Sequence, residues 1–322
     1  MSNVQRPGAP GDLLERIASD IRKSGFPLEV EVLNICSTKN TGRLPSVRYE
    51  YCDQLREIDL VAFYETISRE NSRGPQHTIT ELIIECKKSV EKPWVFFSTP
   101  SYSFENVASF LKYSSEFDLY FSETRSLPLL ARIYPKILRT HYADPALPRC
   151  VAYYEAFKGS GSPSEIYRAI DSVITYLNYS SERRAKRNER LGVFSEFYIP
   201  TIVIDGCLFE ASVDKAKITV KERNHIQVRT LHRGELYIID VVSRNEFQKF
   251  FARIEHLHKE ITSAIAGLNL PPAFISAVRA KEQARVISPE LAGELAMIEE
   301  DSKRRQEILQ RSVKRKARKK SP

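Results

Sequence analysis

Two acidic residues and one lysine stand within two apolar stretches of the sequence and are the first candidates for chemistry. Asp59 lies in REIDLVAFYE (56–65). Glu85 and Lys87 lie in ITELIIECKKS (79–89), with Glu85 26 positions after Asp59. Carboxylates and an ammonium are costly to bury unless a partner compensates their charge. A hard cation such as Mg²⁺ is such a partner, because it takes one or two carboxylates together with water and phosphate oxygens.

Strand geometry predicts how these side chains lie. Residues i and i+2 of a strand share a face, so Glu85 and Lys87 point the same way while Cys86 points to the opposite face. The polar stretch 68–78 predicts a turn region, and an antiparallel pairing of the two strands would bring Asp59 beside Glu85. Lys87 would then stand near a metal-bound water and a phosphate. There it could orient the nucleophile, stabilise charge on the phosphate oxygens or transfer a proton.

The first part of the chain supplies further elements that would position this group. Residues 12–24 predict a helix, because Asp12 and Glu15 match a capping pattern at the start of an apolar-periodic run. Residues 27–36 alternate apolar and polar side chains and predict a strand. Beyond the strand that carries Glu85, the periodicity of residues 104–115 predicts a helix.

The second half of the chain alternates between helices and strands. After a predicted strand at 149–157, residues 162–190 predict a long amphipathic helix with Ser162 or Ser164 as its cap. Four short strands are then predicted, at 198–206, 215–222, 226–232 and 235–243, followed by a helix from about Arg244 to Ala266. Interleaved strands and helices predict an α/β protein with a mixed central sheet.

The pairing of Asp59 with the tripeptide Glu85-Cys86-Lys87 resembles the sequence motif of the PD-(D/E)XK nuclease superfamily. Members of this superfamily share the restriction-endonuclease-like fold. The predicted order of elements at 12–157 is also similar to the superfamily's α-β-β-β-α-β core. The resemblance covers roughly the first half of the chain.

This resemblance implies a metal-dependent phosphodiesterase that acts on DNA, with Mg²⁺ or alternatively Mn²⁺ as its cofactor. It implies that Asp59 and Glu85 are metal ligands and that Lys87 is the catalytic lysine. Some branches carry a glutamate in the first helix, and Glu15 is the position that would match. Nucleases of this kind often act as dimers on two strands, so the resemblance is compatible with a homodimer.

Each of these residues also has a structural interpretation. Asp59, Glu85 and Lys87 could form an ion-pair cluster at the end of a sheet, or belong to a superfamily member that has lost activity. The capping pattern with Asp12 already explains Glu15. The alternative function is therefore a catalytically inactive nuclease-like module that binds nucleic acid or a protein partner. Convergence of the three side chains in an open cleft would favour the enzyme, and an occluded or paired cluster would favour the module.

The positive charge of the chain is concentrated near its C-terminal end. The formal net charge is +8, but residues 302–322 carry ten Lys and Arg against one Glu, so the first 301 residues sum to −1. Such a tail can bind phosphates electrostatically without reading sequence, or it can be a solvated end that binds nothing in particular. The residues expected to contact nucleic acid are Lys314, Arg315, Lys316, Arg318, Lys319 and Lys320.

Composition narrows the class of protein. A chain that is 42% hydrophobic and 28% charged is neither disordered nor fibrous. It contains no apolar run long enough for a membrane span and no secretory signal, so we predict a cytoplasmic protein without a membrane partner. The five cysteines are scattered, which predicts free thiols and neither disulfides nor a zinc site.

The predicted fold is α/β, with a restriction-endonuclease-like core whose central mixed sheet is flanked by helices and extended by further strands. Residues 1–11 are expected to be disordered, and residues 12–266 to form a nuclease domain with core motifs in 12–157 and additional strands in 198–243. Residues 267–322 are expected to form a helical, basic tail. The expected function is a Mg²⁺-dependent DNA endonuclease, with RNA as an alternative substrate.

Overall fold

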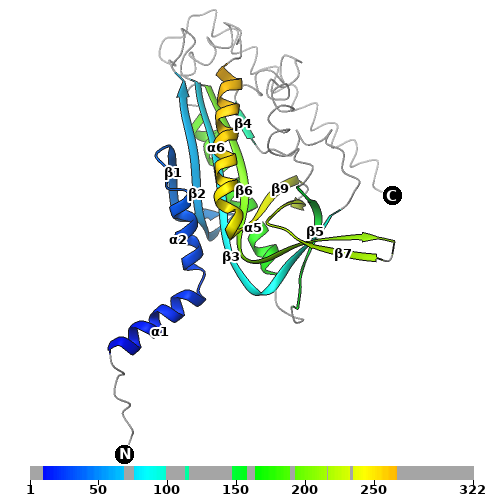
Figure 1. Cartoon of the computed structure of the whole chain (residues 1–322). Helices are drawn as coiled ribbons and strands as arrows, with labels where there is room; N and C mark the ends of the chain where they lie inside the picture. The colour runs from blue at the N-terminus through cyan, green and yellow to red at the C-terminus, as the bar shows by residue number, and fades with distance from the viewer. Residues whose placement is uncertain are drawn as a thin grey trace, which may run out of the picture.

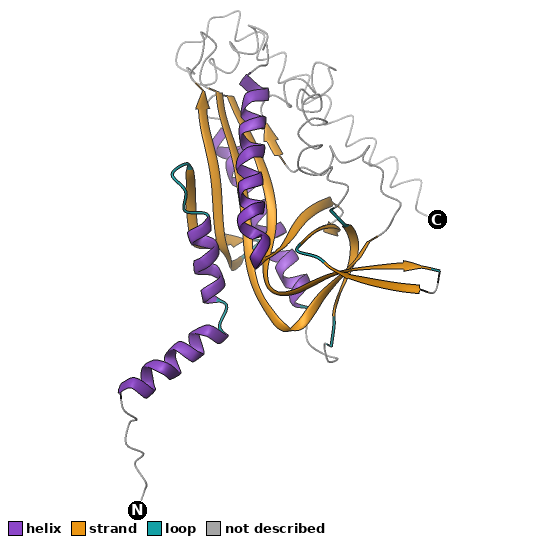
Figure 2. Ribbon diagram, viewed as in Figure 1, coloured by secondary structure: helices purple, strands orange, loops and turns teal. Residues whose placement is uncertain are grey.

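The computed structural model describes residues 10–68, 76–98, 113–115, 147–157, 164–188, 193–215, 217–232 and 235–266. This part of the chain is an α/β protein in which one large mixed sheet is flanked by helices (Figures 1 and 2). The first elements are α1 (Pro10–Lys23), α2 (Phe26–Ile35), β1 (Thr41–Tyr51), β2 (Gln54–Ser68) and β3 (Gln76–Ser98). They are followed by β4 (Tyr113–Ser115), β5 (Arg149–Glu155), α5 (Glu165–Asn188), β6 (Val193–Asp214), β7 (Lys217–Glu222), β8 (His225–His232), β9 (Glu235–Ser243) and α6 (Arg244–Ala266).

The sheet is built around β3 and β6, which run parallel and side by side over most of their length. On one side of this pair, β1, β2 and β3 form an antiparallel meander. On the other side, β3 pairs with β5, β5 with β8, β8 with β9, and β9 returns to β6. Those five strands therefore close into a ring. The short strand β4 and the hairpin strand β7 both pair with β6.

Helices α5 and α6 cover opposite faces of the sheet, as adjacent residues of β3 show. Thr80 lies 3.0 Å from Nδ1 of His258 on α6, whereas the next residue, Glu81, accepts a 3.0 Å hydrogen bond from Ser180 on α5. Since neighbouring strand residues point to opposite faces, the two helices must lie on opposite sides. The buried apolar side chains of α6 are Phe247, Phe250, Phe251, Ile254, Leu257 and Ile261. Those of α5 are Ile166, Ala169, Ile170, Val173, Ile174 and Leu177.

Helix α5 begins at a defined cap. The hydroxyl of Ser164 accepts a hydrogen bond from the backbone N–H of Tyr167 (3.3 Å), so Ser164 is the cap among the two serines considered. The buried carboxylate of Glu155 in β5 accepts a second hydrogen bond, 3.1 Å from the backbone N–H of Glu165. These two bonds fix the start of α5 against the end of β5 and satisfy two of the N–H groups that a helix start leaves without partners.

Helix α1 projects away from the rest of the molecule, with its N-terminal end farthest from the sheet (Figure 1). It is amphipathic, as its sequence predicts, but its apolar side chains are exposed. These residues are Leu13, Leu14, Ile17 and Ile21. None of the described helices combines the length and the apolarity that crossing a membrane requires.

The predicted strand at 27–36 is wrong, because this segment is helix α2. Leu28 and Val32 are buried four residues apart, whereas Val30 between them is 55% exposed, so a helical spacing is buried and the alternation is not. Pro27 stands in the first helical turn, where its missing N–H has no consequence. The strand that precedes β2 is β1, which follows α2 in the chain and was not predicted.

The remaining predicted elements agree with the structure in part. The strands at 56–65, 79–89 and 149–157 and the helices at 12–24, 162–190 and 244–266 are confirmed, and so is the antiparallel pairing of β2 with β3. Helix α1 begins at Pro10, two residues before the start predicted for the first helix. Residues 104–112 of the predicted helix at 104–115 lie outside the described residues, while 113–115 form β4. Residues 1–9 and the tail at 267–322 also lie outside them.

One close backbone approach fixes the bend at the middle of β3. The register between β3 and β6 shifts between Ser89 and Trp94, and β3 curves strongly there (Figure 1). Gly206 of β6 faces Ser89, and a Cβ at Gly206 would lie only 2.4 Å from the carbonyl oxygen of Ser89. A residue with a side chain cannot fit there unless the two strands move apart, so glycine is required by close packing of two backbones.

We therefore expect Gly206→Ala to lower the free energy of unfolding by about 1–3 kcal/mol, the usual range for overpacking a buried site. Gly25→Ala is a matched control, because its Cβ would meet only the flexible end of Glu29 at 3.5 Å. Urea denaturation of both variants measures the difference. If Gly206→Ala is as stable as the unsubstituted protein, the close approach does not constrain β3.

Candidate functional site

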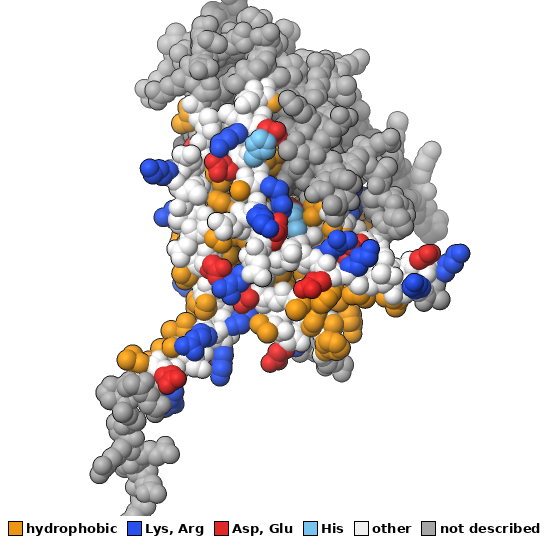
Figure 3. Space-filling model, in the orientation of Figure 1, with side chains coloured by type: hydrophobic (Ala, Val, Ile, Leu, Met, Phe, Trp, Pro, Cys, Tyr) orange, Lys and Arg blue, Asp and Glu red, His pale blue; other side chains and the backbone are white. Residues whose placement is uncertain are grey.

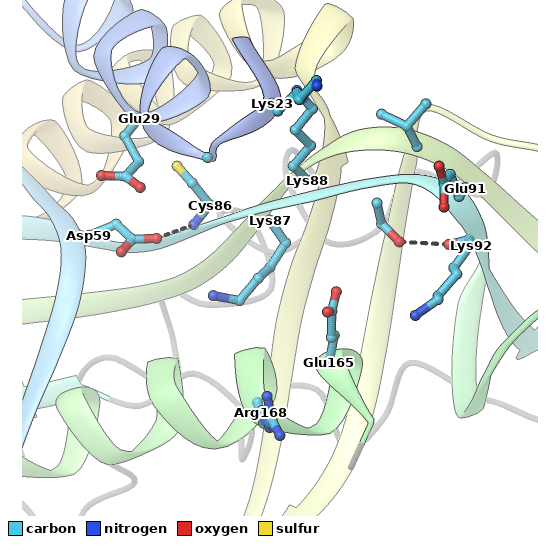
Figure 4. Close-up of a pocket in the computed structure, with 13 residues that line it drawn as sticks. Lys23, Glu29, Asp59, Cys86, Lys87, Lys88, Glu91, Lys92, Glu165 and Arg168 are labelled. Atoms are coloured by element: carbon cyan, nitrogen blue, oxygen red, sulfur yellow. Dashed lines mark hydrogen bonds between the residues drawn. The ribbon is translucent and has the colours of Figure 1, made fainter. Parts of the chain in front are cut away.

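A gap along one edge of β3 defines the site. One edge of β3 pairs with β6 from Gln76 to Ser89 and again from Trp94 to Phe97, so β2 and β5 must share the other edge. On that shared edge, the ladder with β2 ends at Ile84 and the ladder with β5 begins at Trp94. Among the described residues, no strand pairs with this edge of β3 between Ile84 and Trp94. An open cleft of about 820 Å³ lies at this gap (Figure 4).

The lining of the cleft comes from four parts of the chain: the α1–α2 junction, β2, the unpaired stretch of β3 and the start of α5. The lining residues are Lys23, Gly25, Glu29, Asp59, Cys86, Lys87, Lys88, Ser89, Val90, Glu91, Lys92, Glu165 and Arg168. Ten of these thirteen carry ionisable side chains, which is unlike an apolar ligand pocket. The arrangement suits an ionic ligand.

Asp59 closes the end of the β2–β3 ladder. Its register position is one residue beyond the last paired residues, Leu60 and Ile84. Its Oδ2 accepts a 2.7 Å hydrogen bond from the backbone N–H of Cys86 (Figure 4). The carboxylate thus replaces the strand partner that this N–H lacks. The other oxygen, Oδ1, has no hydrogen bond to the described part of the chain.

Glu85 and Lys87 lie on the same side of β3, as the strand spacing predicts. The Nζ of Lys87 lies 2.5 Å from Oε1 of Glu85, and the hydroxyl of Ser172 on α5 donates a 2.9 Å hydrogen bond to Oε2. The side chain of Glu85 is only 8% exposed, whereas that of Lys87 is 27% exposed and lines the cleft. Glu85 therefore lies beneath the cleft surface and holds the ammonium that reaches it.

A third carboxylate comes from α2 and was not predicted. Glu29 lines the cleft beside Asp59 and Cys86 (Figure 4). The pattern at 27–36 was interpreted as a strand, which hid the fact that Glu29 follows the buried Leu28 on a helix that faces the site. A helical interpretation, signalled by Pro27 in the first turn and by the spacing of Leu28 and Val32, would have found it.

The other predicted site residues lie elsewhere. Glu15 is exposed on α1 and does not line the cleft. The tail residues at 314–320 lie outside the described part of the chain. The structure therefore brings together Asp59, Glu85 and Lys87, adds Glu29, and leaves Glu15 apart.

Burial raises the pKa of each of the three carboxyl groups at this site. Burial, and then the charge of Asp59, raise the pKa of Glu85 to about 7. Burial raises the pKa of Asp59 and, together with the charge of Asp59, that of Glu29. Burial by itself would lower the pKa of Lys87, but the carboxylates of Glu85 and Asp59 outweigh it and raise that pKa. The cluster therefore holds more negative charge than one ammonium compensates, which favours a proton or a further cation.

The described residues contain no ready-made cluster of three or more His, Cys, Asp or Glu side chains that could hold a metal ion. Two carboxylates with water and substrate oxygens remain a sufficient set for Mg²⁺. Comparison of the chain with protein-family models, with curated proteins and with solved structures gives no match. The geometry of the cleft is thus the basis for assigning a function.

We expect Glu85→Gln to raise the free energy of unfolding at pH 8 and to change it little at pH 5. The pKa of Glu85 in the fold, about 7, lies above its ordinary value of 4.5. The folded protein therefore binds an extra proton between these values and loses stability as the pH rises through them. Above pH 7 the buried charge remains as a penalty, which the neutral amide removes.

Urea denaturation at the two pH values measures this effect. Glu91→Gln is the matched control for the loss of a carboxylate, because Glu91 is an exposed residue of the same strand. A gain for Glu85→Gln that does not depend on pH would contradict the raised pKa of Glu85.

Proposed function

We propose that the protein is a Mg²⁺-dependent nuclease that hydrolyses phosphodiester bonds of DNA, with the PD-(D/E)XK type of site. One observation carries the proposal: Asp59, Glu85 and Lys87 meet where the β2–β3 ladder ends, at an open cleft. The sequence analysis made convergence of these three side chains in an open cleft the criterion that favours an enzyme over a binding module. The position of Lys87 in the cleft lining supports access.

The order of elements supports the same assignment. The elements α2, β1, β2, β3, α5 and β6 follow the α-β-β-β-α-β order of the restriction-endonuclease-like core, and β6 lies parallel to β3 after the crossing by α5. Compared with the prediction, the first helix becomes α2, the first strand becomes β1, and the final helix and strand become α5 and β6. The β4 and β5 region is then an insertion between the third strand and α5.

The carboxylates fit a hard divalent cation. Oδ1 of Asp59 accepts no hydrogen bond from the described residues, and the charge of Asp59 adds to burial in raising the pKa of Glu85. A cation between them would relieve this repulsion. When bound, Mg²⁺ would polarise the phosphate and lower the pKa of a coordinated water, and Mn²⁺ could replace it.

In this scheme each protein group has a role that follows from its contacts. Cys86 N–H fixes the rotation of the Asp59 carboxylate. Ser172 fixes Oε2 of Glu85, and Oε1 of Glu85 holds the Lys87 ammonium at the cleft surface. Lys87 remains protonated because its pKa is raised, so it would stabilise charge on the phosphate oxygens or orient the attacking water. Glu29 would hold a further water on the α2 side.

The alternative is a nuclease-like module that binds without cutting. It is favoured by the fact that both oxygens of Glu85 already have partners, Lys87 and Ser172. Glu85 could then be a structural carboxylate and its ion pair with Lys87 a stabilising contact. The same cleft would still attract phosphate groups. Under either function, the basic residues at 302–322 would add affinity for nucleic acid through counterion release.

Purified protein with Mg²⁺ should cleave DNA, EDTA should abolish cleavage, and Lys87→Ala should lower the rate by about 100-fold or more, as expected for loss of a group acting in the transition state. Lys249→Ala is the matched control, because Lys249 is an exposed residue of α6 whose ion-pair partner among the described residues is Glu246. A panel of single-stranded and duplex DNA and RNA identifies the substrate. If the Lys87→Ala protein is folded and cleaves normally, the proposed function is wrong.

The two helix glutamates provide a second test. Glu29→Gln should reduce Mg²⁺-dependent cleavage by about 10- to 100-fold, the range typical of residues that support a metal site. Glu15→Gln on α1 should leave the rate unchanged, because Glu15 does not line the cleft. Initial rates at several Mg²⁺ concentrations measure both. If Glu15→Gln slows cleavage and Glu29→Gln does not, Glu15 is the helix glutamate of the site, as the sequence predicted.

A further inference from the structure

Three cations of the cleft lining have no side-chain partner among the described residues. Lys23, Lys92 and Arg168 line the cleft, and none of their side chains forms an ion pair or hydrogen bond within the described part of the chain. Lys88 differs, because its Nζ donates to the carbonyl oxygen of Arg22 at the end of α1. Cations left unpaired around one cleft have no structural role that the contacts reveal, so they are available for a ligand.

These cations lie on both faces of the sheet. Lys23 ends α1 next to α2, and α2 lies on the α6 side, since Glu31 of α2 pairs with Arg244 of α6. Arg168 belongs to α5 on the opposite face. Figure 4 shows Lys23 and Arg168 on opposite sides of β3, with Lys87 between them and Lys92 further along the strand. The cleft is therefore bounded by cations on either side of the proposed site.

The charge of the cleft as a whole is nearly balanced. Glu29 and Asp59 belong to the proposed metal site, and Glu91 and Glu165 also line the cleft. The face of the molecule in Figure 3 likewise carries both signs interspersed. A broad positive field is therefore absent from that face, and individual cations at fixed positions must provide the selectivity for a phosphate backbone.

We propose that one nucleic-acid strand crosses the unpaired edge of β3 with its phosphates held on both sides of the reacting bond. Lys23 binds the phosphate on the α2 side, and Lys92 and Arg168 bind those on the α5 side. A strand held on both flanks presents an internal bond to Lys87, so the cleft selects internal phosphodiester bonds and needs no free end. This inference deepens the proposed function and depends on it for the position of the reacting phosphate.

Binding without metal tests the two flanks separately from catalysis. The full-length protein in EDTA is titrated into a labelled DNA single strand at several salt concentrations. Lys23→Ala and Arg168→Ala should each weaken binding. Each should also make the negative slope of log K against log salt less steep, by about 0.7 per lost phosphate contact. Lys249→Ala should change neither. Unchanged slopes for both variants, or a loss confined to one face, would overturn the two-sided arrangement.

A circular substrate tests the preference for internal bonds. With Mg²⁺, a circular single strand should be cut at a rate similar to that of a linear strand of the same sequence. Degradation of the linear strand alone would overturn the inference while leaving the nuclease assignment intact. Reduced slopes for both variants in a protein that cuts nothing would support the binding arrangement and contradict the proposed function.

Discussion

Between Ile84 and Trp94, the edge of β3 that β2 and β5 share has no strand partner among the described residues, and the cleft depends on this interruption. A strand edge without a partner exposes backbone N–H and C=O groups that must be satisfied in another way. Asp59 satisfies one of them through the N–H of Cys86. The same side chain is thereby fixed at the point where the neighbouring strands separate, next to Glu85 and Lys87. The hydrogen bond from Cys86 to Asp59 therefore both satisfies the unpaired backbone N–H and fixes the position of the carboxylate.

The second constraint is electrostatic. Glu85 is buried between β3 and α5 with a pKa near 7, and the nearby carboxyl groups of Asp59 and Glu29 also have raised pKa values. Stability alone does not select such a cluster, because buried charges are usually neutral or destabilising compared with apolar residues. Its energetic penalty is easiest to understand if a ligand compensates it. Raised pKa values in a cleft are a common property of functional sites.

The sequence predicted the part of the site that depends on short-range geometry. Glu85 and Lys87 share a face because strands have a period of two, and the apolar runs around them were strong enough to predict β2 and β3. Glu29 was missed because LEVEV alternates like a strand, although the tertiary structure buries only Leu28 and Val32. Local alternation could not reveal this, since the outcome was decided by packing. The gap that opens the cleft was also beyond local pattern, because it results from β2 and β5, distant in sequence, sharing one edge of β3.

Strand β6 connects β3, the strand that carries the site, to the five-stranded ring through its pairing with β9. It backs β3 behind the cleft, touches it most closely where Gly206 faces Ser89, and pairs with β9 from Thr201 to Ile204, just before that contact. The strand that pairs with β3 beside the cleft is thus also one of the five strands of the ring. Because β6 pairs with β3 and with β9, Gly206 lies where the strand that carries the site and the ring are packed together. The close packing at this glycine therefore bears on both parts of the sheet at once.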